Sequence, residues 1–325
     1  MAEMDIALID PQIAPEMAEV DRQIVRILGA DHPFLAELNR RITETPGKRL
    51  RPKLLLLCAN MLGYTEQDSS LYGAVFELIH TATLVHDDVI DGASIRRGKP
   101  TLNSEMDNTL TVLYGDLLYT RAHAAAIEAG RLEVLATITQ ASQKMIEGEL
   151  LQAHVNYDLQ IDEKTYFDIL HRKTAFLFAG TTRSAAQIAD CDEATCATLY
   201  DFGFQFGISF QLIDDYLDYV SNEATMGKPV LSDLRGGKVT LPVIRALAAD
   251  DGKLADAIRD FWANPEQDVP ALLIEAIHTG GGLAETRKLA AEAAEKTVAA
   301  LSTIPDNKFT TFLRALPAFM LGRMK

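Results

Sequence analysis

The feature that most constrains how this chain can fold is the helical spacing of its apolar residues. Within residues 71–85, apolar side chains recur every three or four positions, at Leu71, Val75, Leu78, Ile79, Ala82 and Val85. The same spacing continues through most of the chain, whereas the alternation of apolar and polar residues that is typical of a half-buried strand is hard to find. The sequence therefore predicts an all-α fold.

Proline, glycine and helix-capping residues divide this pattern into about a dozen helices. The predicted helices before the C-terminal third, where the pattern is weaker, span residues 15–30, 33–44, 52–62, 67–91, 108–130, 132–154, 163–189, 194–220 and 242–249. Much of the Gly, Pro, Lys and Arg lies in three longer connections, at residues 45–51, 92–107 and 221–239. No linker or break in composition marks a domain boundary, so we expect one domain over residues 1–325.

Composition and charge exclude several classes of partner. The 325 residues carry 31 Lys and Arg against 46 Asp and Glu, a net charge of −15, so nonspecific attraction to nucleic acid or an anionic membrane is not expected. Cys58, Cys191 and Cys196 lack the spacing of a zinc or redox motif and indicate free thiols in a reducing compartment. With no leader peptide and no run of roughly 18 to 20 apolar residues, the sequence predicts a cytoplasmic protein without a membrane span.

One acidic pattern occurs twice, as DDVID at 87–91 and as DDYLD at 214–218, each time after a long apolar helical segment. Aspartates four positions apart lie on one helix face, about 40° apart, where they repel each other and oppose the dipole of a helix C-terminus. A solvated helix end is the ordinary interpretation of one such motif, but two copies favour a metal site. Carboxylates without His or Cys suit Mg²⁺, which completes its shell with water and substrate phosphates.

Basic residues close to these acids support a phosphorylated substrate. Arg96, Arg97 and Lys99 follow the first acidic motif, and the stretch PGKRLRPK at 46–53 places Lys48 and Arg51 at a predicted helix start. Arginine and lysine can hold the phosphate oxygens that a metal leaves uncovered. The latter stretch is not a P-loop, because the preceding glycine and the hydroxyl residue are missing.

Two further stretches and one histidine provide candidate residues. HRKTAF contains Lys173 and Thr174, and MGKPVLSDLRGGKVTLP contains Lys228 and Lys238. His80 lies about two helical turns before Asp87 and so on nearly the same face, although a histidine there is more often part of the core.

Together these motifs resemble the trans-prenyltransferases, the polyprenyl diphosphate synthases, in one ordered set from about residue 47 to 242. The set is Gly-Lys-x-x-Arg, DDxxD with Arg-Arg-Gly, Lys-Thr, Phe-Gln-x-x-DDxxD, Gly-Lys and Gly-Lys-x-Thr-Leu-Pro. The resemblance implies a single bundle of long, mostly antiparallel helices around a deep central cavity, in a homodimer. It also implies that the two acidic motifs face each other near the mouth of that cavity.

The resemblance implies a role for each matching position. Three Mg²⁺ would bind Asp87, Asp88, Asp91, Asp214 and Asp218, with Asp215 behind them. The allylic diphosphate would be held by Lys173, Lys228, Lys238 and Arg96. Isopentenyl diphosphate would be bound by Lys48, Arg51, His80 and Arg97, while Thr174 and Gln211 would lie beside the developing cation. An apolar lining of the cavity could come from Phe206, Phe210 and Leu84, for which ordinary helix packing is an equally good reading.

The expected reaction is Mg²⁺-dependent condensation of isopentenyl diphosphate onto an allylic primer, farnesyl or geranylgeranyl diphosphate. Members of this family that make short chains often carry an aromatic residue five positions before the first motif, where this chain has Ala82 followed by Thr83. Since each five-carbon unit needs roughly one helical turn, about 5.4 Å, small residues there predict a product of about C40 to C50 for quinone side chains. A shorter C15 to C20 product is the alternative.

Other interpretations explain fewer residues. A His-Asp metal phosphohydrolase would use His80, His86, Asp87 and Asp214, but leaves Asp91, Asp218 and the Arg-Arg-Gly stretch without a role. Glu77 and His80 match half of a di-iron carboxylate site, whose second Glu-x-x-His is missing. A non-enzymatic scaffold would be expected to have lost one of the acidic motifs.

Replacing Ala82 with Tyr tests the predicted control of chain length. The larger ring should close the path of the growing chain and shift the products toward C15 to C20. The prenyl alcohols are sized after dephosphorylation of the products. An unchanged long product would show that position 82 does not limit the chain.

Overall fold

The computed structural model describes residues 10–44, 47–66, 68–96, 98–220, 231–249, 251–264 and 270–324. Within these ranges the chain is helical except for short connections and one hairpin, in which β1 (Ile95–Arg96) pairs antiparallel with β2 (Lys99–Pro100). The prediction of an all-α fold is therefore confirmed. Of the predicted site residues, Arg97 and Lys228 lie outside the described residues.

Except for α5 (Leu102–Glu105), which lies within the predicted connection at 92–107, the helices of the first half follow the predicted bounds to within a few residues. They are α1 (Ala14–Leu28), α2 (Pro33–Thr43), α3 (Leu50–Met61), α4 (Asp68–Ile90), α5 (Leu102–Glu105), α6 (Asn108–Glu128) and α7 (Leu132–Val155). Local chemistry sets several starts: the Asp107 side chain caps α6 by accepting the N–H of Leu110, and proline occupies the first turn of α1 and α2.

In the second half, the predicted helix at 163–189 is interrupted. It consists of α8 (Glu163–Leu170), a π-helical turn (His171–Ala175) and α9 (Phe176–Ile188). A Cβ on Gly148 of α7 would lie only 2.6 Å from the backbone nitrogen of Lys173, so the turn can approach α7 only because residue 148 has no side chain. Isolated π-helical turns are frequent at functional sites.

The remaining helices complete the bundle. They are α10 (Glu193–Val220), α12 (Ser232–Arg235), α13 (Leu241–Ala249), α14 (Lys253–Ala263), α15 (Ala271–Thr279), α16 (Gly282–Ala300) and α17 (Lys308–Gly322), with 3-10 turns at Asp10–Gln12 and Leu301–Thr303. In the part of the chain that is described, none of the helices has the length and apolar character needed to cross a bilayer.

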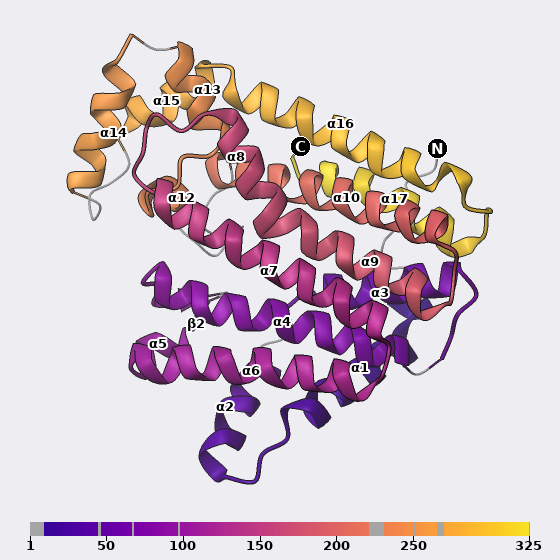
Figure 1. Cartoon of the computed structure of the whole chain (residues 1–325). Coiled ribbons are helices and arrows are strands. Elements are labelled where there is room, and N and C mark those ends of the chain that lie inside the picture. Colours follow the sequence, from indigo (N-terminus) through magenta and orange to yellow (C-terminus); the bar gives the residue numbers. More distant parts are fainter. Residues whose placement is uncertain are drawn as a thin grey trace.

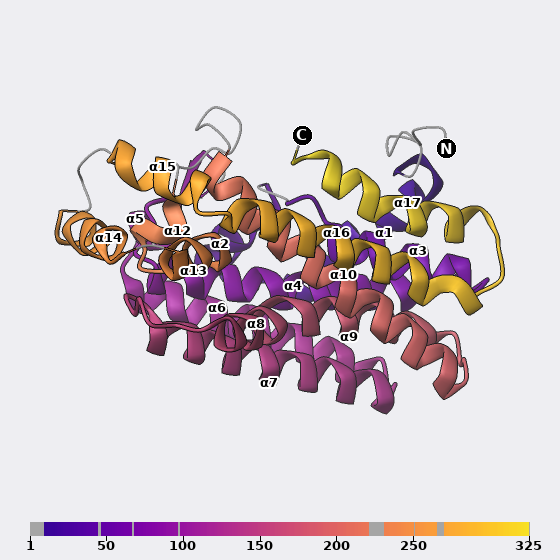
Figure 2. The same cartoon turned by 90° about the horizontal axis from the view of Figure 1, so that it is seen from above.

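The long helices lie side by side, with α9 at the centre of the packing (Figures 1 and 2). It contacts α3, α4, α7 and α10, and nearly all of its residues are buried. Helices α4 and α10 both end toward the left of Figure 1, where β2 and α12 lie. The fold thus carries the C-terminal ends of two helices, and with them both acidic motifs, to the same end of the bundle.

Candidate active site

The first acidic motif forms the last turn of α4 and is already paired with cations. The Asp88 side chain is buried and accepts a hydrogen bond from Nε of Arg96 at 2.6 Å. Asp91 accepts one from Nζ of Lys238 at 2.8 Å. Burial raises the pKa of Asp87 to about 6, and Lys173 opposes that shift. The carboxylates of this motif therefore lie where negative charge is costly and positive charge is favoured.

The second acidic motif forms the last turn of α10. Asp218 is buried and accepts hydrogen bonds from the Ser232 hydroxyl at 2.7 Å and the Asp233 backbone N–H at 3.1 Å. Asp215 accepts from the Tyr166 hydroxyl at 2.5 Å and from Nε2 of Gln211 at 2.7 Å. Burial raises the pKa of Asp215 to about 7, with Asp233 adding to the shift.

Lys238 connects the first motif to the segment that follows the second. Its backbone N–H donates to the carbonyl of Asp233, which follows the second motif, while its ammonium group donates to Asp91 of the first. Burial by itself would lower the pKa of Lys238, but Asp91 and Asp233 outweigh burial and the pKa is raised. One lysine therefore interacts with acids from two segments that lie 142 residues apart in sequence, from Asp91 to Asp233.

The π-helical turn places Lys173 and Thr174 beside the same acids. Nζ of Lys173 lies 2.5 Å from Oε2 of Glu149 on α7. The Thr174 hydroxyl donates to Oε1 of Gln211 at 2.8 Å, and Gln211 in turn donates to Asp215. The predicted residues Thr174 and Gln211 are thus connected to the second motif through hydrogen bonds, whereas Lys173 pairs with Glu149 and acts on Asp87 of the first motif.

Three of the residues predicted to bind isopentenyl diphosphate are described, and they lie on α3, on α4 and in the segment before α3. Arg51 is buried, with its guanidinium 4.5 Å from the centre of the Phe178 ring. Burial lowers its pKa to about 10, and Glu77 opposes that shift. Lys48 is exposed just before α3, and His80 is partly buried on α4.

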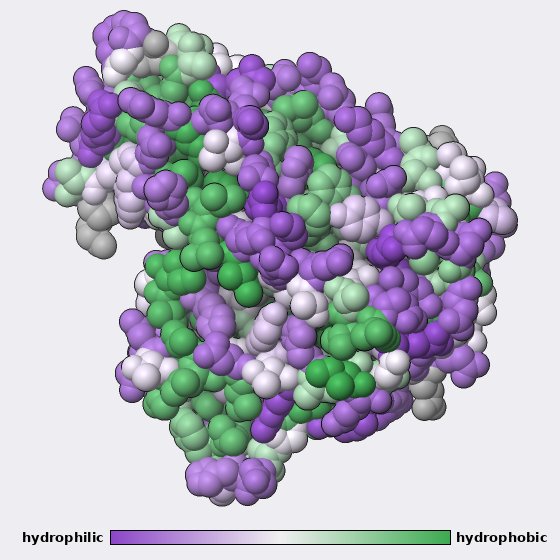
Figure 3. Space-filling view, viewed as in Figure 1, coloured by the Kyte–Doolittle hydropathy of each residue, from purple (hydrophilic) through white to green (hydrophobic). Residues whose placement is uncertain are grey.

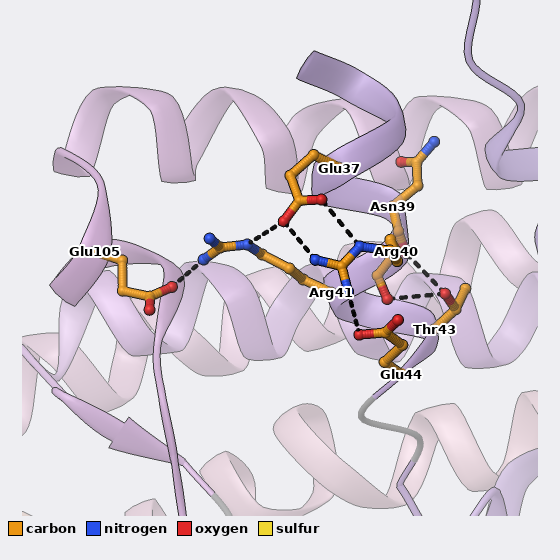
Figure 4. A network of polar contacts seen from close by, with 7 residues as sticks. All are labelled: Glu37, Asn39, Arg40, Arg41, Thr43, Glu44 and Glu105. Carbon is orange, nitrogen blue, oxygen red and sulfur yellow. Dashed lines mark hydrogen bonds and ion pairs between the residues drawn. The ribbon is translucent and has the colours of Figure 1, made fainter. Parts of the chain in front are cut away.

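A cavity of about 340 Å³ lies against the first motif, between α2, α4 and the hairpin. Asp88 and Arg96 form part of its wall, and Arg40 and Arg41 of α2 line the opposite side. Those two arginines pair with Glu37, Glu44 and Glu105 (Figure 4), so the wall on α2 is electrostatically balanced before any ligand enters.

Two sets of predicted apolar residues occupy different places. Leu84 lines this cavity, whereas Phe206 and Phe210 pack against the ring of Phe178, at centroid distances of 5.4 and 5.3 Å.

Ala82 is buried in the core, and the Thr83 hydroxyl donates to the backbone carbonyl of His80 at 2.8 Å. The side chains at the predicted length-controlling positions are therefore small and already packed.

Three residues at the site were missed by the sequence reasoning: Glu149, Tyr166 and Asp233. Glu149 pairs with Lys173, Tyr166 holds Asp215, and Asp233 faces both Asp215 and Lys238. Asp233 lies five residues before Lys238 in a stretch already singled out, which was a usable signal. The other two sit on helices whose contact with the site follows only from the fold.

The donor set suits a hard divalent cation. Its candidate ligands are carboxylate oxygens, and burial, with a smaller contribution from Glu149 and Asp91, raises the pKa of Asp87. Within the described residues, no three His, Cys, Asp or Glu side chains are grouped closely enough to form a metal site by themselves.

Comparison with known proteins decides the family. The family model described as polyprenyl synthetase matches residues 32–276. The chain belongs to this family. The sequence is also 37% identical to octaprenyl diphosphate synthase of Escherichia coli over 321 residues, which are 98% of this chain and 99% of that one. The sequence-based prediction of a prenyltransferase is thereby confirmed.

Solved structures of this family share the whole fold. Polyprenyl synthase from Caulobacter crescentus, solved with calcium and isoprenyl diphosphate, has a TM-score of 0.93 at 33% identity, covering 100% of both chains. Decaprenyl diphosphate synthase from Rhodobacter capsulatus has a TM-score of 0.92 at 32% identity, covering 99% of this chain and all of that one.

Replacing Tyr166 with Phe tests the support of Asp215. The change leaves a buried carboxylate oxygen without its donor, which should lower the free energy of unfolding by about 1 to 3 kcal/mol in a urea titration. Tyr200→Phe is the matched control, because that ring stacks on Phe204 and should change stability by less than about 0.5 kcal/mol. Equal stability of the two variants would contradict the assigned hydrogen bond.

Proposed function

We propose that this chain condenses isopentenyl diphosphate head to tail onto an allylic diphosphate and releases a long-chain all-trans polyprenyl diphosphate. The observation that carries the proposal is the position of Lys238: its ammonium group donates to Asp91 of the first motif, and the segment before it is hydrogen-bonded to Asp218 of the second through Ser232 and Asp233. The long-chain type of product, predicted from the sequence, is confirmed by relatives such as the octaprenyl synthase and an all-trans-nonaprenyl-diphosphate synthase from Rhodobacter capsulatus, 33% identical over 96% of both chains.

Magnesium would be held by Asp87, Asp88 and Asp91 on one side and by Asp214 and Asp218 on the other. When bound, Mg²⁺ neutralises charge on the departing diphosphate and so favours ionisation of the allylic C–O bond. Asp215 has a separate role in this scheme: its two hydrogen bonds orient Gln211 and hold Tyr166 rather than a metal. We propose three Mg²⁺ in the loaded site.

The cations of the site have to change partners when substrate binds. Arg96, Lys173 and Lys238 each pair with a carboxylate in the free chain and would each turn to a phosphate oxygen of the allylic diphosphate. Lys228 completes this proposed set. The carboxylates released by these cations then face the metal.

The second substrate would bind next to the first. We assign isopentenyl diphosphate to Lys48, Arg51, His80 and Arg97, so that its double bond can attack the allylic cation while the released diphosphate takes up the proton. Thr174 and Gln211 direct hydroxyl and amide oxygens, which carry partial negative charge, into the region between α9 and α10. Such oxygens stabilise positive charge that develops nearby.

We further propose a product of about C40 to C50, made from a farnesyl or geranylgeranyl primer and used for quinone side chains. Small side chains at Ala82 and Thr83 support the long product.

We also propose a single domain and a cytoplasmic location. The single domain is supported by one cluster of buried apolar residues that extends from Ile13 to Met324. The cytoplasmic location is supported by the free thiols of the cysteines.

The rival phosphohydrolase is not supported by the position of His86. Its Nε2 lies 3.1 Å from the carbonyl of Val112 and 3.3 Å from Oδ1 of Asp116, both on α6. A histidine directed at α6 is poorly placed to share a metal with Asp214 of α10.

We propose a homodimer through the face formed by α6 and α7. Leu113 and Ile127 on α6, and Leu132 and Leu150 on α7, are 58 to 74% exposed. Apolar side chains gather on this side of the molecule (Figure 3), over the position of α5 and α6 in Figure 1. Exposed apolar surface of this kind is typical of a face covered by a second copy.

The reaction is tested by incubating the protein with labelled isopentenyl diphosphate and farnesyl diphosphate, then sizing the prenyl alcohols. We expect products of about C40 to C50 with Mg²⁺ and none after chelation. Asp91→Asn and Asp214→Asn should each lower kcat by about 100-fold or more, whereas Asp116→Asn on α6 should keep full turnover. Phosphate release from mononucleotides without prenyl products would favour the phosphohydrolase.

The proposed dimer is tested by light scattering after size exclusion. Leu113→Arg places a charge in the proposed interface, which should cost about 3 to 5 kcal/mol and reduce the mass from twice 35.7 kDa to the monomer value. Phe319→Arg, at an exposed position of α17, should remain dimeric. A monomeric wild-type protein, or a dimeric Leu113→Arg variant, would contradict the assigned face.

A further inference from the structure

One short segment joins the two acidic motifs. Residues 231–238, called here the bridge segment, begin where the Leu231 N–H donates to the carbonyl of Asp218 at 3.0 Å. They end at Lys238, whose ammonium group donates to Asp91. The inner side of the bridge segment therefore faces the proposed diphosphate site, and the position of its backbone determines where Lys238 can reach.

Tyr157, which follows α7, holds the bridge segment from another side. Its N–H donates to the carbonyl of Gly237 at 2.8 Å. Its ring lies so close to Gly237 that a Cβ on that glycine would be 2.7 Å from Cε2 and Cζ of the ring. Position 237, with φ of +81°, therefore needs glycine both for its backbone conformation and for the contact with the ring.

Trp262 on α14 holds the same segment through a second contact. Its indole N–H donates to the carbonyl of Leu234 at 2.6 Å. The two rings meet edge to face, with 5.2 Å between the centroids of Tyr157 and Trp262 and 79° between their planes. Figure 1 shows α14 beside α12, the helical turn that the bridge segment contains.

The conformation of Tyr157 indicates that this contact does more than add packing. The residue has φ of 65°, which is uncommon for residues other than glycine, and Tyr157 as a whole is 57% exposed. A residue so exposed buries little apolar area. The unusual backbone is thus retained by the contact with Gly237, next to Lys238.

We propose that Tyr157 and Trp262 form an aromatic clamp that positions Lys238 for binding the diphosphate group. They are positioning residues, since they act through the backbone of Gly237 and Leu234. Lys238 is only 17% exposed and already bound to Asp91, so a small shift of its backbone changes whether its ammonium group can reach a phosphate. The proposal rests on the proposed function, because it requires that this site binds diphosphate.

A double-mutant cycle tests the clamp, with calorimetric titration of inorganic diphosphate in the presence of Mg²⁺. Tyr157→Ala should weaken diphosphate binding about fivefold to tenfold, and Lys238→Ala at least as much. If Tyr157 acts through Lys238, Tyr157→Ala should weaken binding by less than about twofold once Lys238 is alanine. Tyr157→Phe keeps the ring and should recover most of the affinity.

Two controls separate the clamp from a general loss of structure. Trp262 is the single tryptophan of the chain, so a red shift of its emission in Tyr157→Ala reports directly that the ring contact is lost. Phe319→Ala removes an aromatic ring of similar exposure from α17 and should leave diphosphate affinity unchanged. Thermal unfolding of each variant verifies that it is folded.

The outcomes are distinct. If Tyr157→Ala weakens diphosphate binding equally in the wild-type protein and in the Lys238→Ala variant, the clamp is overturned while the proposed function stays intact. A wild-type protein that does not bind diphosphate in the presence of Mg²⁺ would overturn the proposed function, and the clamp with it. Full affinity of Tyr157→Ala with a red-shifted Trp262 would show that the contact exists but does not position Lys238.

Discussion

The ion pair between Lys238 and Asp91 is the interaction on which the rest of the site depends. Two helices end in acidic motifs at the same end of the bundle, where their charges repel each other and oppose both helix dipoles. A lysine from a third segment pairs with Asp91, and the charges of Asp91, Asp233 and Glu149 raise its pKa although burial would lower it. In the free chain, Arg96 and Lys238 hold Asp88 and Asp91, and in the function proposed above metal and diphosphate would replace those contacts.

A second network keeps the catalytic face rigid. Asp215, buried under the second motif, receives hydrogen bonds from Tyr166 and Gln211, and Gln211 in turn accepts one from Thr174 in the π-helical turn. Satisfied buried networks of this kind hold side chains in one arrangement. Within this motif, both Asp215 and Asp218 are buried; Asp215 is held by Tyr166 and Gln211, and Asp218 by Ser232 and the backbone of Asp233.

The features of this site that depend on residues close in sequence could be predicted, whereas those that depend on contacts between different helices could not. The i, i+4 spacing of Asp87 and Asp91, and of Asp214 and Asp218, follows from local helix geometry, so the acidic motifs were predictable without a fold. The π-helical turn was not, because it depends on the missing side chain of Gly148 in a different helix. Glu149 and Tyr166 were missed for the same reason, since their partners Lys173 and Asp215 lie 24 and 49 residues away.

A crystal structure with Mn²⁺ and inorganic diphosphate tests the central claim most directly, because Mn²⁺ can be located by its anomalous scattering. We expect metal positions between Asp87 or Asp91 of α4 and Asp214 or Asp218 of α10, with the ammonium group of Lys238 moved from Asp91 to a phosphate oxygen. Metal bound at one acidic motif alone, with Lys238 still on Asp91 and diphosphate elsewhere, would contradict the claim that the two motifs act as one site.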